Sequence, residues 1–135
     1  GYSQNWVNQR LKSIEIRKSL TDEWEKRGVK EGIEFAILTD EITQAWTGLT
    51  TKEYKKLKGI KKENLRDNMT NLELVLNMLA ETATTEISDK QEPKTLNENK
   101  SVAREGGSVA GNARREIEMK TGKNVITKSK PKMLK

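Results

Sequence analysis

Helix start and stop signals recur along the chain and constrain its fold more than any other feature. Thr70 is followed three residues later by Glu73, the spacing of a capping box that opens a helix. Thr50 and Glu53 repeat this spacing earlier in the chain. Glycines that suit helix ends stand at Gly28, Gly48, Gly59 and Gly122. This succession predicts an all-α fold, a compact multi-helix domain.

Apolar residues at helical spacing support the same fold and predict which sides of the helices are buried. Near the N-terminus, Asn5 is expected to cap a helix whose apolar face is Val7, Leu11 and Ile14. Thr21 is a second start signal, so one bent helix and two separate helices both remain open. Two later faces are predicted: Leu38, Ile42, Ala45 and Trp46; and, after Thr70, Leu72, Val75, Leu76 and Leu79, widened by Leu74 and Met78.

Composition separates a packed part of the chain from a polar part. Hydrophobic residues make up 33% and charged residues 34%, and all three tryptophans fall in the first third. An apolar share this low predicts a thin core. We therefore expect a helical core domain over residues 1–89, a polar linker over 90–98, a Gly/Ala-faced helix over 99–122 and a flexible basic tail over 123–135.

The expected C-terminal helix has small residues along one face: Ala103, Gly107, Ala110 and Gly111. A glycine in a helix interior costs roughly 1 kcal/mol, so such a face suggests that another backbone approaches it closely. Packing onto another helix of the same molecule is favoured over docking onto a partner chain. A homo-oligomer is compatible with this face, but the sequence does not determine it.

The residues needed for most enzyme chemistry are missing or badly spaced. The chain has no cysteine and no histidine, which removes the usual zinc ligands and the commonest general base. Adjacent acids such as Asp40 and Glu41 diverge on a helix and are better explained as charges near its positive end. Glu118 and Lys120 have a nuclease-like spacing but lie in a helical stretch, where a solvated face is the better interpretation. We expect no catalytic residue, no metal site and no cofactor.

Targeting signals are absent as well. No apolar run is long enough to cross a bilayer, and no signal peptide opens the chain. The default expectation is a cytoplasmic protein without a membrane partner.

Basic residues are the stronger functional signal. The formal net charge is +6, and most of the excess lies in the C-terminal third. Two groups stand out as candidate contacts to nucleic acid or a protein partner: Lys52, Lys55, Lys56, Lys58, Lys61, Lys62 and Arg66; and Arg114, Arg115, Lys120 and Lys123. Such clusters attract phosphates or acidic surfaces. A merely solvated helix face explains the first group equally well.

Three segments occur in order along the chain: WVNQRLKSIEIRKSLTDEWEKRGVKEGIEFAILTDEIT, KEYKKLKGIKKENLRDNMTNLELVLNMLAE and GGSVAGNARREIEMKTGKNVI. As a set they resemble the C-terminal half of the DNA-damage-inducible protein D family, which is related to prophage antirepressors with a BRO-type N-terminal domain. The BRO-type half is not in this sequence, so we expect a fragment or a product that lacks it. Residues 66–69 (RDNM) and 111–114 (GNAR) are family-like motifs without an assigned role.

The resemblance implies a non-enzymatic cytoplasmic protein of the bacterial DNA-damage (SOS) response or of a prophage. Family members are linked to control of recombinase filaments on single-stranded DNA, or to relief of phage repression. Our first hypothesis is therefore a helical module that binds a DNA-associated protein such as a recombinase filament. The alternative is direct binding of nucleic acid through the same lysines, which predicts a steep loss of affinity with salt. A nucleic-acid enzyme ranks well below both.

Overall fold

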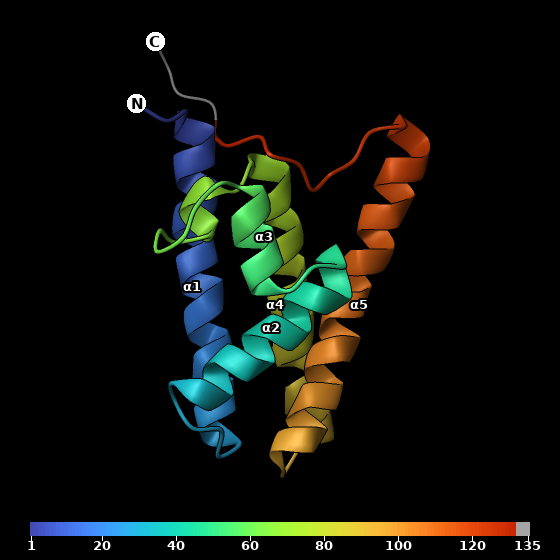
Figure 1. Ribbon diagram of the computed structural model, residues 1–135. Helices are drawn as coiled ribbons and strands as arrows, with labels where there is room; N and C mark the ends of the chain where they lie inside the picture. Colours follow the sequence, from blue (N-terminus) through green and yellow to red (C-terminus); the bar gives the residue numbers. More distant parts are fainter. Residues whose placement is uncertain (132–135) are drawn as a thin grey trace.

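The computed structural model describes residues 1–131 and is all-α, as the sequence predicts (Figure 1). Its elements are α1 (Gln4–Lys26), α2 (Ile33–Thr47), α3 (Thr51–Leu57), the 3-10 turn η1 (Arg66–Asn68), α4 (Asn71–Gln91) and α5 (Leu96–Thr121). No β-strand occurs within residues 1–131. Across that same range, none of the helices combines the length and the apolar character that crossing a bilayer requires.

Three long helices, α1, α4 and α5, run along the length of the molecule, and α2 crosses them obliquely (Figure 1). α2 packs against α5 and α4, and α4 lies between α1 and α5 in contact with both. The short helix α3 lies beside the end of α2. The segment after α5 returns across the top of the molecule towards the start of α1 (Figure 1).

Two of the four predicted helix starts, the capping boxes at Thr50 and Thr70, are confirmed. Both capping boxes form: the Thr50 and Thr70 hydroxyls accept from the backbone N–H of the glutamate three residues later, and each glutamate accepts in return. The predicted cap of α1 is wrong, because Ser3 rather than Asn5 caps it by accepting from the Trp6 N–H. α1 is one helix, and Thr21 lies inside it with its hydroxyl donated to the Lys18 carbonyl.

The predicted buried face of α1 is wrong. Leu11 and Ile14 are exposed, whereas Trp6, Ser13, Leu20 and Trp24 are buried. A tryptophan buries far more apolar area than a leucine, so the Trp6–Trp24 side of the helix faces the core. The buried Trp6 indole N–H also finds a partner, since it donates to the Met69 carbonyl at 2.9 Å.

The predicted buried face of α4 is only partly correct. Leu72, Val75 and Leu79 remain about 40% exposed, while Leu74, Leu76 and Met78 are buried. The inner face instead carries polar residues: Glu73, Asn77, Glu81, Thr84 and Ser88. Thr84 donates to the Ala80 carbonyl of its own helix, and the other four have partners from distant parts of the chain, which allows polar side chains to be buried there.

A buried charged cluster joins α3 to α4. The Lys58 ammonium pairs with the Glu73 carboxylate at 2.6 Å, with both side chains fully buried. The Tyr54 hydroxyl donates to the second Glu73 oxygen. Burial raises the pKa of Tyr54 far above its usual range, and the neighbouring Glu73 charge adds to the rise. Lys58 also donates to the Ser129 carbonyl, so the cluster fixes the C-terminal segment as well.

The small-residue face of α5 packs within the same molecule. Ala103 and Ala110 are fully buried. A Cβ atom on Gly107 would lie 2.7 Å from the Ile42 carbonyl oxygen, and one on Gly111 would lie 2.6 Å from the Ala45 carbonyl oxygen. Both backbones belong to α2, so these glycines let two helices approach more closely than any larger residue would allow.

The predicted polar linker and the predicted flexible tail are both more ordered than expected. The connection between α4 and α5 is only residues 92–95, because α4 continues to Gln91, and Pro93 within it is buried. Residues 123–131 are extended, as expected, but not free: Val125 is buried, and its N–H donates to Glu118 at 3.0 Å. The predicted flexible tail therefore does not begin at residue 123. Its last part, residues 132–135, lies outside the described residues.

Candidate partner-binding surface

Five lysines of α3 and the following loop form a cationic surface, which we call the lysine surface: Lys52, Lys55, Lys56, Lys61 and Lys62. Lys55 is half-buried and the other four are exposed. None of the five makes an ion pair with the residues described here, 1–131. Lys52, Lys55 and Lys56 belong to α3, whose inner side is anchored in the core by Tyr54, and Lys61 and Lys62 belong to the loop that follows. The predicted cluster of seven cations thus supplies five that are free to meet a ligand.

The other two cations of the predicted cluster are structural. Lys58 is fully buried against Glu73. Arg66 pairs with Glu81 at 2.8 Å, and its side chain is 20% exposed. Sequence spacing could not separate these two from their neighbours, since both acidic partners lie fifteen residues away along the chain.

The second predicted group is divided in the same way. Arg114 donates to the Trp46 carbonyl at 2.7 Å and pairs with Glu118 at 2.7 Å, so it ties α5 to the end of α2. Arg115 donates to the Asn112 side chain of its own helix. Lys120 is exposed but pairs with Glu116. Lys123 is exposed and follows Gly122, the cap of α5.

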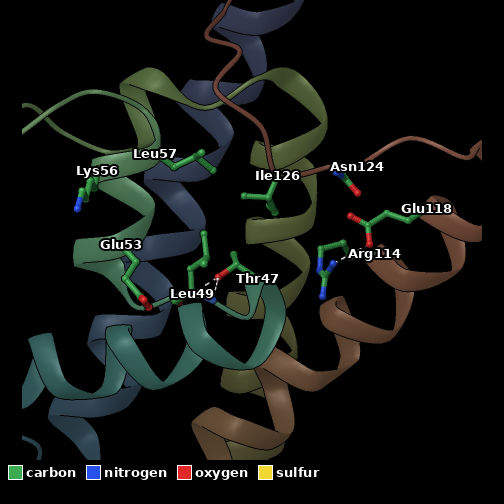
Figure 2. Close-up of a pocket in the computed structure, with 9 residues that line it drawn as sticks. All are labelled: Thr47, Leu49, Glu53, Lys56, Leu57, Arg114, Glu118, Asn124 and Ile126. Atoms are coloured by element: carbon green, nitrogen blue, oxygen red, sulfur yellow. Dashed lines mark hydrogen bonds and ion pairs between the residues drawn. The ribbon is translucent and has the colours of Figure 1, made fainter.

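A groove of about 670 Å³ adjoins one side of α3 (Figure 2). α3 contributes Glu53, Lys56 and Leu57, and the opposite wall is the Arg114–Glu118 pair of α5. Ile126 of the C-terminal segment lies between the two walls in Figure 2. The groove therefore contains both signs of charge over an apolar floor, a poor setting for a polyanion.

A second groove, of about 890 Å³, lies on the other side of α3 against α1 and α2. Lys52, Lys55 and Lys61 of the lysine surface line it, together with Arg17. Its acid, Asp40, is occupied in accepting from the Thr51 N–H at 2.7 Å and from Gln44. This groove is the more cationic of the two, and we call it the basic groove.

Arg17 connects the basic groove to the core. Its guanidinium pairs with Glu81 at 2.9 Å, donates to the Thr39 hydroxyl at 2.7 Å, and lies over the Trp24 ring. Burial lowers the pKa of Arg17, and the Glu81 charge opposes that change. Sequence reasoning missed Arg17 and Thr39, because their partners are brought together only by the packing of α1, α2 and α4.

The acids considered for catalysis have structural partners. Glu23 accepts from Arg27 and from the Ser88 hydroxyl, and Glu41 pairs with Arg104. Glu118 accepts from Arg114 and from the Val125 N–H. Within residues 1–131, no group of three or more metal-ligating side chains comes together. Each of these three carboxylates therefore takes part in a contact within the fold, and none of the contacts requires a catalytic role.

Among residues 1–131, the one aromatic side chain that lines the basic groove beside the lysines is the half-buried Phe35. Trp6, Trp24, Trp46 and Tyr54 are buried, and Phe35 packs against Trp24. Tyr2 is exposed and packs on Trp6 in a tilted arrangement, with the ring centroids 4.5 Å apart. Base stacking on aromatic rings is the usual means of holding single-stranded nucleic acid, and the lysine surface lacks it.

One family model matches almost the whole chain: the DinD C-terminal domain, over residues 4–131. No curated protein and no solved structure matches the chain.

Proposed function

We propose that this chain, which belongs to the DinD C-terminal domain family, is a non-enzymatic regulator that binds a DNA-associated protein. The family is associated with the response to DNA damage. The favoured partner is a recombinase filament on single-stranded DNA, in the bacterial SOS response or in a prophage. The protein would act by occupying that partner and not by transforming a substrate.

The lysine surface is the observation that carries this proposal. Five cations without ion pairs surround one short helix, whereas most buried or half-buried arginines of the molecule are neutralised. A local excess of one sign of charge steers an oppositely charged partner into place and accelerates encounter. An acidic protein surface would supply the opposite charge, and so would phosphates of DNA to which the partner protein is bound.

Two observations favour a protein over bare nucleic acid. The grooves beside α3 contain carboxylates from Glu53, Glu118 and Asp40, which repel a continuous row of phosphates. The exposed stripe Leu72, Val75 and Leu79 on α4 offers apolar area that a protein partner could bury and a phosphate backbone could not.

Direct nucleic-acid binding is the second candidate, and the position of the C-terminal segment favours it. Lys58 holds the Ser129 carbonyl, which brings the neighbouring Lys128 and Lys130 close to α3. These lysines extend the cationic area beyond the lysine surface. Binding of this kind would rest on phosphate contacts and would be highly sensitive to salt.

Charge reversal at the lysine surface tests the proposal. The variant Lys52→Glu/Lys56→Glu/Lys61→Glu should bind a recombinase-coated filament at least about tenfold more weakly, because all three changes oppose an acidic partner. Fluorescence anisotropy of labelled filament measures this. Filament binding that is unchanged in the variant would overturn the proposed surface.

A matched control separates local charge from net charge. Lys12, Lys18 and Lys26 are exposed lysines of α1 that pair with acids of α1 or α4. Converting these three to glutamate changes the net charge by the same amount. This control variant should keep its affinity for the filament within about twofold.

A further inference from the structure

We propose that a small cavity between α2, α3, η1 and α4 is a binding site for a carboxylate group. The cavity has a volume of about 190 Å³. Its polar lining includes Thr51 of α3, Lys55 of α3, Arg66 of η1 and Asn77 of α4. Nothing in the proposed function requires this site, because a surface of lysines could attract a partner without it.

Hydrogen-bond donors in this cavity lack partners. Thr51 Oγ1, Arg66 Nε and Asn77 Nδ2 are buried and make no hydrogen bond with any described residue, 1–131. Buried donors are nearly always satisfied, and each one left unsatisfied costs free energy. Three such groups around a single cavity indicate that something absent from the chain itself completes them.

The orientation of the Asn77 amide is fixed by a neighbour. The Trp46 indole N–H, which can only donate, is 3.2 Å from Asn77 Oδ1. The amide nitrogen is therefore the free end of a side chain that is only 4% exposed. A buried amide nitrogen next to a cavity can satisfy itself only with an acceptor inside that cavity.

Two hydroxyl groups of the lining donate to backbone carbonyls of α2, and Glu81, which lies behind Arg66, uses one of its two oxygens. The Thr39 hydroxyl donates to the Phe35 carbonyl and accepts from Arg17. The Thr43 hydroxyl donates to the Thr39 carbonyl at 2.9 Å. Glu81 accepts from both Arg17 and Arg66 through one oxygen, while its other oxygen has no partner.

Charge also favours an anion. Three cations, from Arg17, Arg66 and Lys55, surround the cavity or its mouth, against the two carboxylates of Glu81 and Asp40. A carboxylate is acceptor-only and offers about four lone-pair sites. The donors of Thr51, Arg66 and Asn77, with the Lys55 ammonium, match that number. A water molecule would bring two protons of its own into a site already rich in donors.

The cavity opens towards the basic groove. The two share Thr39, Thr51 and Lys55 in their linings, and the groove is several times larger. A free small carboxylate could enter by this route. An extended acidic peptide could equally lie in the groove and insert one glutamate or aspartate side chain.

NMR titration of the ¹⁵N-labelled full chain tests the site. Sodium acetate is the first probe, and a short capped peptide with one central glutamate is the second. The resonances of Arg66 Nε–H, Asn77 Nδ2–H and the Trp46 indole N–H should shift together and saturate. For acetate we expect a dissociation constant on the order of 1 mM, as suits a ligand of so few atoms. Saturation by acetate alone identifies a small-anion site, and saturation by the peptide alone identifies a side-chain site; both support the proposal.

Two variants make the test specific. Asn77→Asp keeps the acceptor for Trp46 and replaces the free donor with a second acceptor beside Arg66, so it should abolish binding of both probes. Thr51→Val removes only the unpartnered hydroxyl and should weaken binding about fivefold to tenfold without loss of thermal stability. Thr82→Val makes the same change on the exposed side of α4 and is the matched control.

The proposal is overturned if neither carboxylate shifts the Arg66 and Asn77 resonances, or if inorganic phosphate alone does so. Unchanged binding by Asn77→Asp would overturn it too. Circular dichroism checks that this variant folds, and Thr51→Val carries the test if it does not. Because the titration uses the isolated chain, its failure would leave the filament-binding proposal intact, and failure of filament binding would leave the cavity intact.

Discussion

At the scale of single residues, stability is concentrated in a few buried polar contacts. Tyr54, Lys58 and Glu73 join α3, α4 and the C-terminal segment through one carboxylate. The Glu73 side chain also closes the capping box of α4, so its loss would affect both the helix start and the cluster. Breaking a buried ion pair costs much more than the pair contributes, because the remaining charge is left without a partner.

Substitution of one partner should therefore destabilise the protein strongly. We expect Lys58→Met to lower the free energy of unfolding by about 3–5 kcal/mol, measured by urea denaturation. The double variant Lys58→Met/Glu73→Gln should recover part of that loss, since it leaves no buried charge. A loss below about 1 kcal/mol for Lys58→Met would show that Glu73 does not depend on Lys58.

Tyr54 gives a prediction for alkaline pH. Burial disfavours the charged tyrosinate, so the folded chain binds this proton more tightly than the unfolded chain. The resulting stability is fully present below the ordinary tyrosine pKa of about 10 and is lost as the pH rises above it. In a Tyr2→Phe variant, tyrosinate absorbance should appear only together with loss of the helical circular dichroism signal. Tyrosinate formed in a chain that is still folded would contradict this account.

At the scale of helices, local signals and long-range contacts differ in how well the sequence predicts them. Helix starts are well predicted because a capping box such as Thr50 with Glu53 is complete within four residues. The buried faces of α1 and α4 are not, because Ser13 and Asn77 face inward while Leu11 and Leu72 face solvent. The partner of the Asn77 side-chain oxygen is Trp46, thirty-one residues away, and no spacing rule indicates it.

The glycines of α5 predict close packing on another helix, and in the structure this helix is α2. The contact gives a prediction at the scale of helices. Gly107→Ala would gain roughly 1 kcal/mol in helix propensity, but its Cβ would press on the Ile42 carbonyl. We expect a net loss of about 1–2 kcal/mol in the free energy of unfolding, because this overpacking must move a backbone. Thermal denaturation against Ser108→Ala, on the exposed side of the same helix, is the comparison. A stabilised Gly107→Ala would mean that α5 does not pack this closely.

At the scale of the whole molecule, the cationic residues divide into structural and free sets that the sequence alone could not separate. The predicted clusters contain the lysine surface, but they also contain Lys58, Arg66 and Arg114, which hold helices together. The basic groove is formed where α1, α2 and α3 meet, so no single segment could reveal it. Among residues 1–131 the molecule thus presents lysines without ion pairs on α3 and in the following loop, and exposed leucines on α4.

Binding of labelled single-stranded DNA, bare and coated with recombinase, tests the central claim most directly when it is measured at about 50 and 200 mM salt. The account predicts that the protein binds the coated filament at both salt concentrations and binds the bare strand weakly at both. Tight binding to the bare strand at low salt, lost at high salt and no stronger on the filament, would contradict it and make the protein a direct nucleic-acid binder.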